Sequence, residues 1–239
     1  MGKKIKENYR RLPLEKVYNA RDLGGYAGKG KKPTRFHQFI RTDNLSEATL
    51  KDQEFLKNYG VTATLDLRGK EEAQQYPNPF QDDPEVEYIN IPFITESIMD
   101  VRKIQTEGFY VPDFYQNLID SHELVNEIMT FIAKQKGAVL FHCMAGKDRT
   151  GIVAMLLLGL CGVSRDDIAA DYQVTRTYLE DYVDLHLREE LKDLEHSKAE
   201  WMKKSYDYLI GKYQSFEQYF LEVGLSQKTI KKIRKKLIG

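Results

Sequence analysis

One stretch of the chain, AVLFHCMAGKDRTGIVAMLLLGLCG at residues 138–162, constrains the fold more than any other. Residues 138–142 form a short apolar run that starts just after Gly137, as expected of a buried strand. From Thr150 onward the sequence is apolar over a length that suits a buried helix. Between them lies a short loop with a cysteine, a lysine, an aspartate and an arginine. The stretch therefore predicts a strand, a charged loop and a helix.

A loop that runs from the end of a strand into the start of a helix is a ready-made anion site, because unpaired N–H groups and the helix dipole converge there. The same field favours the thiolate form of Cys143. Arg149 adds a planar guanidinium that can bind two oxygens of a phosphate. We therefore expect the loop to bind a phosphate dianion with the sulfur of Cys143 beneath the phosphorus.

The other loop residues have distinct expected roles. Cys143 is predicted to be the nucleophile because a charged loop follows it at once, whereas Cys161 lies in an apolar run and is predicted to be a structural thiol. Thr150 either donates its hydroxyl to the departing sulfur or simply belongs to the first helical turn. Gly146 permits a backbone angle that other residues resist. Backbone N–H groups for the phosphate are expected from Met144, Ala145, Gly146 and Lys147.

His142 precedes the nucleophile directly, but neighbouring residues that leave a strand point to opposite faces. It is therefore expected to hydrogen-bond the loop from behind, in a supporting role, rather than act as a base for Cys143. The alternative is an ordinary core histidine. No other cysteine or histidine lies at ligand spacing, so we predict no metal site.

The loop sequence CMAGKDRT at residues 143–150 resembles the signature of cysteine-dependent protein tyrosine and dual-specificity phosphatases. Together with NARDLGG at residues 19–25, it is similar to the atypical bacterial tyrosine phosphatases known from mycobacteria and Listeria, several of which also act on phosphoinositides. Three further matches follow in the order of that branch: RTDNL at 41–45, LDLR at 65–68 and YQSFEQY at 213–219. The resemblance covers roughly residues 12–239.

The resemblance implies a phosphocysteine mechanism without a cofactor, in which Arg149 holds the phosphate and Asp148 protonates the leaving group. The position where many phosphatases carry a mobile aspartate is empty here, since no aspartate follows residues 86–91 until Asp100. Asp66, at the end of a predicted strand, is the second candidate for the acid, and Asp148 could instead only orient Arg149.

Two cations near the loop have open assignments. Lys147 either attracts substrates with more than one phosphate, such as phosphoinositide head groups, or faces solvent. Arg21 belongs to the second motif of the resemblance and either pairs with Asp22 or Asp43 or faces the phosphate pocket.

Composition restricts the remaining possibilities. The chain has 239 residues, of which 36 are acidic and 36 basic, so no net charge draws it to nucleic acid. No run approaches the ~20 apolar residues that span a bilayer, and the basic N-terminus is not followed by an apolar stretch, so we expect no transmembrane segment and no secretory signal. Two cysteines favour a reducing cytoplasm over a disulfide framework.

Along the chain, periodicity predicts one domain over residues 1–239, with an α/β core at about 12–162. A glycine-rich turn at 26–33, strands at 36–41, 61–67 and 86–91, and helices at 46–59, 69–76 and 112–135 imply a mainly parallel sheet flanked by helices, as in phosphotyrosine phosphatases. Residues 92–110 lack periodicity and are a candidate active-site loop.

Residues 163–239 are predicted to be a helical extension, in which the charged residues 180–204 form either a solvated helix pair or a lid over the phosphate loop. It ends in a basic amphipathic helix at 228–236, whose lysines are solvated or contact an anionic lipid surface.

The sequence thus predicts a cysteine-dependent phosphatase for phosphotyrosine, with phosphoserine, phosphothreonine and phosphoinositide monoesters as further candidate substrates. The competing functions are a non-catalytic phosphate-binding module and a rhodanese-like sulfurtransferase.

Overall fold

The computed structural model describes residues 4–94, 110–180 and 196–238. Within these ranges one sheet has the strand order β1-β2-β5-β3-β4, in which only β1 runs antiparallel to its neighbour. The strands are β1 (Arg21–Asp22), β2 (Phe39–Thr42), β3 (Val61–Asp66), β4 (Glu87–Asn90) and β5 (Ala138–His142). The predicted α/β class, with a mainly parallel sheet, is confirmed.

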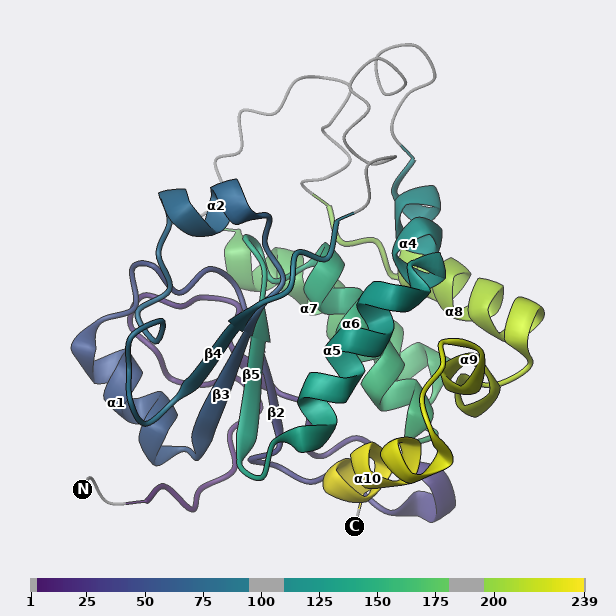
Figure 1. The fold of residues 1–239 in the computed structure, drawn as a ribbon, viewed down its shortest axis with the longest axis horizontal. Helices are drawn as coiled ribbons and strands as arrows, with labels where there is room; N and C mark the ends of the chain where they lie inside the picture. Colours follow the sequence, from purple (N-terminus) through teal and green to yellow (C-terminus); the bar gives the residue numbers. More distant parts are fainter. Residues whose placement is uncertain (1–3, 95–109, 181–195, 239) are drawn as a thin grey trace.

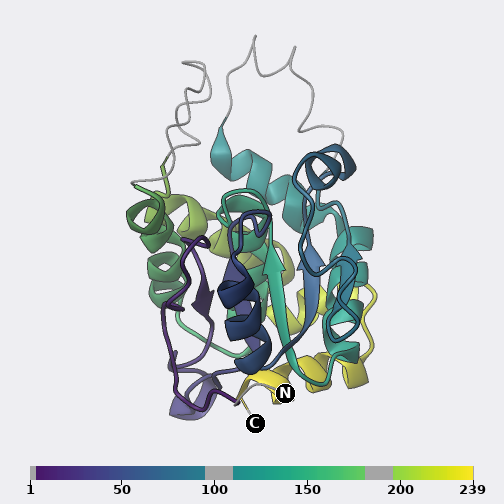
Figure 2. The ribbon, with the colours of Figure 1, turned by 90° about the vertical axis from the view of Figure 1, so that its left-hand side faces the viewer.

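Helices cover both faces of this sheet (Figure 1). Helix α1 lies on one face, and α5 and α6 lie on the other, as the view turned by 90° also shows (Figure 2). The helices are α1 (Leu50–Asn58), α2 (Lys70–Gln75), α4 (Val111–Asp120), α5 (His122–Lys134), α6 (Asp148–Leu160), α7 (Arg165–Leu179), α8 (Ala199–Tyr213), α9 (Phe216–Glu222) and α10 (Gln227–Ile238), with a short 3-10 helix η1 (Lys29–Lys31).

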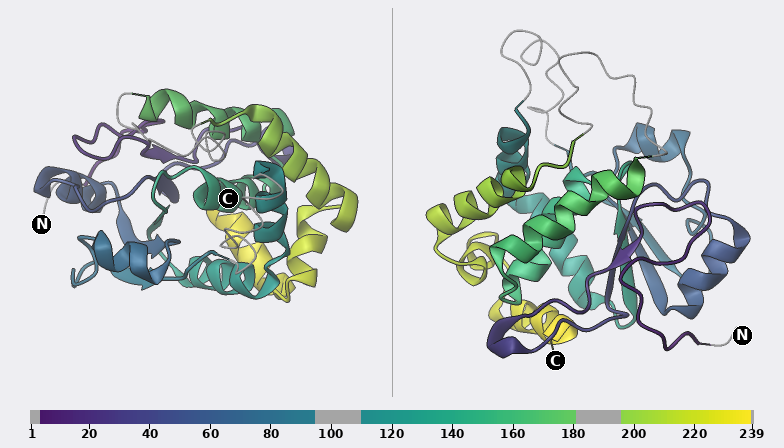
Figure 3. Two further views of the ribbon diagram at one scale, coloured as in Figure 1. Left: turned by 90° about the horizontal axis from the view of Figure 1, so that it is seen from above. Right: turned by 180° about the vertical axis from the view of Figure 1, so that it is seen from behind.

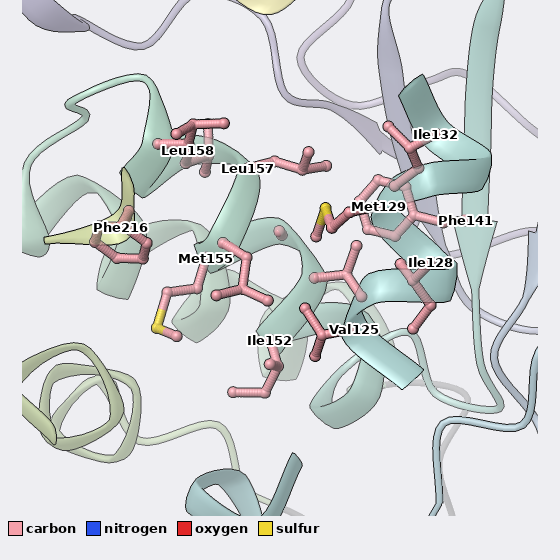
Figure 4. Packing of buried hydrophobic residues seen from close by; sticks show 14 of the residues in the cluster. Val125, Ile128, Met129, Ile132, Phe141, Ile152, Met155, Leu157, Leu158 and Phe216 are labelled. Atoms are coloured by element: carbon pink, nitrogen blue, oxygen red, sulfur yellow. The ribbon is translucent and has the colours of Figure 1, made fainter. Parts of the chain in front are cut away.

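Helix α6 is the centre of the larger hydrophobic core. Its sequence DRTGIVAMLLLGL is apolar on all sides, which is typical of a helix with no solvent-facing surface. Ile152 and Leu157 of α6 pack among Ile128 and Met129 of α5 and Phe141 of β5 (Figure 4). A smaller cluster under α1 buries the opposite face of the sheet. Both ends of the phosphate loop, β5 and α6, are therefore held rigidly.

The predicted helical extension after residue 162 packs into the same core. Trp201 of α8, Phe216 of α9 and Ile233 of α10 are buried in the cluster around α6. In α10 the apolar side predicted from the sequence is buried in that cluster. Any contact of this helix with an anionic lipid surface would therefore rest on its lysines alone.

Two predicted helices differ from the structure. The helix expected at 112–135 is two helices, because the chain turns at Ser121 (φ −79°, ψ 64°) between α4 and α5. The helix expected from residue 46 begins at Leu50, where Thr49 and Asp52 form a reciprocal capping box. Local hydrogen bonding of short polar side chains decided this second boundary, and hydrophobic periodicity does not detect it.

The remaining boundaries shift by a few residues. The turn at 26–33 is formed, with a bridge between Ala27 and Pro33, but the strand that follows is paired from Phe39 rather than from residue 36. Most of the predicted active-site loop, residues 95–109, and most of the candidate lid, residues 181–195, lie outside the described residues.

Candidate active site

The predicted phosphate loop lies at the carboxyl edge of the sheet. Cys143 follows β5, and α6 begins five residues later at Asp148. In the parallel register His142 stands beside Thr42 of β2 on one side and Asp66 of β3 on the other. Three strands thus deliver three sequence motifs to one edge, which is seen from above in Figure 3. This edge is where α/β sheets bind ligands.

The carbonyl groups of the loop point outward, and each has a donor. The Asn44 backbone N–H donates to Met144 O at 2.8 Å. The Asn19 side-chain amide donates to Ala145 O at 2.8 Å, and Arg41 Nη2 donates to Gly146 O at 2.7 Å. In a trans peptide the next N–H points opposite to the carbonyl, and the described residues contain no cis peptide. The N–H groups of residues 145–147 are therefore turned to the inner side of the loop.

Gly146 makes this turn possible. Its φ is +63°, in the left-handed region. A Cβ at this position would lie 2.3 Å from Thr42 O and 2.6 Å from Asp43 N, which is within contact distance of rigid backbone. The loop therefore packs backbone to backbone on the end of β2, and a side chain at residue 146 would push it away.

Cys143 and His142 are both buried, and His142 faces away from the thiol. Its Nδ1 is 3.2 Å from Cys143 O and its Nε2 is 2.9 Å from the Asn78 amide. These partners assign the proton to Nδ1, which donates, and leave Nε2 as the acceptor. Burial lowers the pKa of His142 to about 4, so the ring is neutral near pH 7. Its contacts fix the backbone of Cys143 rather than its sulfur.

The Arg149 guanidinium projects from the first turn of α6 and is held by Glu72 of α2. Nη1 lies 2.6 Å from Glu72 Oε2, and Nη2 lies 3.0 Å from Oε1. Burial by itself would lower the pKa of Arg149, but the hydrogen bonds of Glu72 and the charge of Cys143 raise it above its usual value. The guanidinium is thus permanently charged and aimed by a carboxylate on a neighbouring helix.

Thr150, one residue further along α6, is fully buried. Among the described residues its hydroxyl has no hydrogen-bond partner. A buried hydroxyl without a partner costs free energy, which makes this group unusual in the folded chain.

Lys147 is enclosed rather than solvent-facing, and its neighbour Asp148 is partly exposed. Asp148 Oδ1 accepts a hydrogen bond of 2.5 Å from the hydroxyl of Tyr115 on α4. Lys147 is 4% exposed, its Nζ donates to His196 O at 2.9 Å, and it lies 3.6 Å from Asp148 Oδ1. The solvent-facing alternative for Lys147 is therefore wrong.

Asp66, the second candidate for the acid, is fully buried beneath the site. Its two oxygens accept from Arg68 Nε at 2.8 Å and Arg68 Nη2 at 2.6 Å, and Tyr88 donates to Oδ2 as well. Burial alone would raise the pKa of Asp66, but the hydrogen bonds and charge of Arg68 keep it below its ordinary value. Its geometry is that of an ionised structural anchor.

Arg21 pairs with neither Asp22 nor Asp43, which corrects both ion pairs considered from the sequence. Its Nε lies 3.0 Å from Asp171 Oδ1 on α7, and its Nη1 is bonded to the Asn19 side chain that holds the loop. Asp22 instead accepts from backbone N–H groups, and Asp43 accepts from the Asn19 N–H. Arg21 therefore acts on the loop through Asn19.

Comparison with known proteins agrees with this geometry. Residues 12–239 match the family described as "Tyrosine phosphatase family". The chain belongs to the tyrosine phosphatase family.

Two curated relatives of this chain illustrate the range of similarity. A tyrosine-protein phosphatase of Nostoc commune is 38% identical over 148 residues, which are 59% of this chain and 49% of that protein. The triple specificity protein phosphatase PtpB of Mycobacterium tuberculosis is 24% identical over an alignment of 276 residues that covers 95% of this chain and 98% of PtpB. The chain thus spans about half the length of the Nostoc relative.

Among solved structures, P. aeruginosa TpbA is similar with a TM-score of 0.40 and 13% identity, over 79% of this chain and 87% of that one.

Three residues of the candidate site were not predicted from the sequence. Glu72 and Tyr115 carry no motif, and only the fold brings them to the loop. Asp171 could have been identified from the sequence, because it is a carboxylate within the buried stripe of α7 that contains Ile168 and Tyr172. A buried charge in such a stripe indicates a paired cation, here two arginines.

In the described part of the chain, no group of three or more histidine, cysteine, aspartate or glutamate residues could hold a metal ion. No helix in the same residues is long and apolar enough to cross a membrane.

Proposed function

We propose that the chain hydrolyses phosphotyrosine monoesters through a phosphocysteine intermediate. The observation that carries this proposal is the orientation of the loop, whose carbonyl groups are held outward by Asn44, Asn19 and Arg41. The opposing N–H groups then supply a cradle of donors above Cys143, and preorganised donors of this kind stabilise charge that develops on phosphate oxygens. Family membership supports the same reaction.

In the first step, the Cys143 thiolate attacks phosphorus and the bond from phosphorus to the ester oxygen breaks. Arg149 binds two of the phosphate oxygens and holds them more tightly as the transition state is reached. Asp148 donates its proton to the leaving oxygen, so the products of this step are a phenol or alcohol and the phosphocysteine. We assign the acid to Asp148 because Asp66 is fully engaged with Arg68.

In the second step, water attacks the phosphocysteine, the bond from phosphorus to sulfur breaks, and inorganic phosphate is released. The Asp148 carboxylate accepts the proton of the attacking water. The buried hydroxyl of Thr150, which has no partner among the described residues, donates to the sulfur as it becomes a thiolate again. Arginine, lysine and amide groups carry the charge in both steps, so the proposed mechanism uses no cofactor.

The substrate range extends, in this proposal, to phosphoinositides and to phosphoserine and phosphothreonine. Lys147 is a second cation next to Asp148 on the loop, where it could bind an additional phosphate group. The name of PtpB, triple specificity protein phosphatase, supports a broad range for a relative that aligns over nearly the whole chain. The lysines of α10 could add an electrostatic contact with an anionic lipid surface.

We place the protein in the cytoplasm, because the proposed nucleophile must stay reduced and both cysteines are free thiols.

The test is phosphate release from a phosphotyrosine peptide by the wild-type chain and by Cys143→Ser. The variant should lose turnover and still bind vanadate, since the cradle consists of amides and Arg149, and chelators should have no effect on the wild type. Binding without turnover in the wild type would instead indicate a phosphate-binding module. Transfer of sulfur from thiosulfate without phosphatase activity would indicate a sulfurtransferase.

A further inference from the structure

Behind the proposed acid lies a chain of two buried tyrosines. Helices α4 and α7 both pack against α6, and each contributes one tyrosine to the space beside Asp148. The hydroxyl of Tyr115 is 2.5 Å from Asp148 Oδ1 and 2.6 Å from the hydroxyl of Tyr172. Both tyrosines are fully buried, and their rings meet edge to face at 5.9 Å. These hydroxyls therefore serve Asp148 rather than solvent.

The direction of the hydrogen bonds follows from the acceptor at the end. An ionised carboxylate can only accept, so Tyr115 must donate to it, and Tyr172 must then donate to the oxygen of Tyr115. Burial and the negative charge of Asp148 raise the pKa of both phenols well above its usual value, so each keeps its proton. The chain runs in one direction, from Tyr172 through Tyr115 to Asp148.

The contacts of Asp148 are unequal at its two oxygens. Tyr115 and the Lys147 ammonium both approach Oδ1, the latter at 3.6 Å. An oxygen that accepts a hydrogen bond from a phenol and faces a cation is a poor place for a proton. When the carboxyl group is protonated, its proton is therefore directed to Oδ2.

We propose that Tyr115 is the positioning residue of the general acid: by holding Oδ1 of Asp148 as an acceptor, it places the transferable proton on Oδ2. This proposal rests on the proposed function. As the ester bond breaks, the Oδ2 proton passes to the leaving oxygen, and the carboxylate that forms is stabilised by the Tyr115 hydroxyl. In the second step a proton from water returns to Oδ2. Tyr172 supports the chain by donating to Tyr115.

The charged and titratable groups around Asp148 in the described residues define the experiment. Besides Tyr115 on α4 and Tyr172 on α7, they are Lys147 on the loop and the pair of Arg149 and Cys143, whose charges interact with each other. The Tyr115→Phe variant keeps all of these groups except the Tyr115 hydroxyl. This variant therefore isolates the one hydrogen bond to Oδ1.

The experiment compares the wild type with Tyr115→Phe on an activated aryl phosphate and on an alkyl phosphate, across pH. General acid assistance is worth about 10²–10⁴-fold, and loss of the directing hydrogen bond should remove about tenfold of it for the alkyl phosphate only. The ionised form of Asp148 also loses a donor, so the basic limb of the kcat profile should move to higher pH. Tyr172→Phe should produce the same changes in weaker form.

A matched control is Tyr219→Phe, which removes another buried tyrosine hydroxyl that donates to Ile119 O in α4, at 2.7 Å. It should leave both the leaving-group dependence and the basic limb unchanged. In the Asp148→Asn background, Tyr115→Phe should add no further leaving-group dependence, because the acid is already absent. Equal losses on both substrates with an unmoved basic limb would reduce Tyr115 to a structural residue and overturn the proposal.

Failure of the proposed function gives a different result. A wild-type chain that releases no phosphate from any monoester overturns both inferences, whereas an active wild type with an unaltered Tyr115→Phe profile overturns only the second. Circular dichroism and thermal unfolding of each variant confirm that the comparison is made between folded proteins.

Discussion

Glu72 binds the Arg149 guanidinium end-on, through Nη1 at 2.6 Å and Nη2 at 3.0 Å. An end-on pair leaves the edge formed by Nε and Nη2 free to bind a phosphate in the same planar fork. Glu72 itself is fixed at the start of α2, where its carboxylate accepts from the Gly69 N–H at 2.8 Å. Burial alone would raise the pKa of Glu72, but the hydrogen bonds and charge of Arg149 hold it below its ordinary value, so the pair stays ionised.

Replacement of Glu72 by glutamine should therefore separate two effects of the carboxylate, namely the orientation of the Arg149 guanidinium and the negative charge next to the site. The amide keeps the shape but loses one acceptor and the negative charge, so Arg149 is aimed less well and kcat should fall on the order of tenfold. The site also loses an anion that repels phosphate, so the inhibition constant for vanadate should decrease. Steady-state kinetics with vanadate inhibition measure both quantities.

Glu71→Gln is the matched control, because Glu71 is exposed on the same turn of α2. It should change neither parameter. A Glu72→Gln variant with kcat unchanged would show that Arg149 is aimed by the loop alone.

Asp148→Asn should affect substrates according to their leaving groups. If Asp148 protonates the departing oxygen, the variant should slow alkyl phosphates by about 10²–10⁴-fold and activated aryl phosphates much less. Initial rates on a series of aryl and alkyl phosphates measure this dependence. Equal losses on all substrates would make Asp148 a structural partner of Tyr115.

Asp66→Asn is the comparison, since it alters the other carboxylate that the sequence offers. It removes charge from a buried pair with Arg68 and should lower the free energy of unfolding instead of changing the leaving-group dependence.

The sequence was sufficient to predict the strand that ends beside Cys143. Residues 138–142 form a short apolar run, and every one of them is buried in the structure. The sequence was also sufficient to predict the loop, because few other structures place a cysteine, a glycine and an arginine between a strand and a helix. Gly146 shows why, because a glycine in this loop predicts the left-handed φ that the structure has, whereas its close approach to Thr42 O is seen only in the structure.

The surroundings of the loop could not be predicted in the same way. The sequence offered Asp22 and Asp43 as partners for Arg21, and only the tertiary placement of α7 brings Asp171 to it. Tyr115 is one of 15 tyrosines in the chain, and its role depends on a contact with Asp148 across 33 positions. Long-range polar contacts of this kind follow from tertiary packing, which local patterns do not encode.

Lys147→Ala tests the proposed preference for substrates with several phosphate groups. The variant should lower kcat/KM for a polyphosphorylated inositol lipid more than for a singly phosphorylated tyrosine peptide, because only the lipid carries a second phosphate for the ammonium. A single ammonium near an anion is worth on the order of one to a few kcal/mol, depending on exposure. The difference between substrates should decrease as ionic strength rises.

Lys203→Ala is the control for Lys147, since Lys203 is a partly exposed lysine of α8 paired with Asp166. Equal losses for both substrates at every salt concentration would mean that Lys147 serves only the loop, through its hydrogen bond to His196 O. Activity on the peptide with none on any inositol lipid would restrict the chain to protein substrates.

Asp171 joins Arg21 and Arg41 behind the loop, and its replacement by asparagine should destabilise the protein. The carboxylate lies 3.0 Å from Arg21 Nε and 2.5 Å from Arg41 Nη1, and all three side chains are almost completely buried. Removal of the shared anion leaves two buried cations without a counter-charge, which typically costs about 3–5 kcal/mol. Urea unfolding at pH 7 measures the difference.

The pH dependence of this difference has a defined sign. Burial alone would raise the pKa of Asp171, but Arg21 and Arg41 hold it far below its ordinary value. The contribution of Asp171 is therefore complete above the pKa of an unfolded aspartate, about 3.9, and is lost as the pH falls below it. The gap between wild type and Asp171→Asn should be constant from pH 7 to about pH 5 and should close at lower pH.

Asp166→Asn on the same helix should leave the urea midpoint unchanged, because Asp166 is exposed and its ion pair with Lys203 lies at the surface. The Asp171→Asn variant should also lose activity, since Arg41 holds Gly146 O and can no longer be fixed by Asp171. A stable, fully active Asp171→Asn protein would show that the hydrogen bonds of Asn19 and Asn44 hold the loop carbonyl groups without the two arginines.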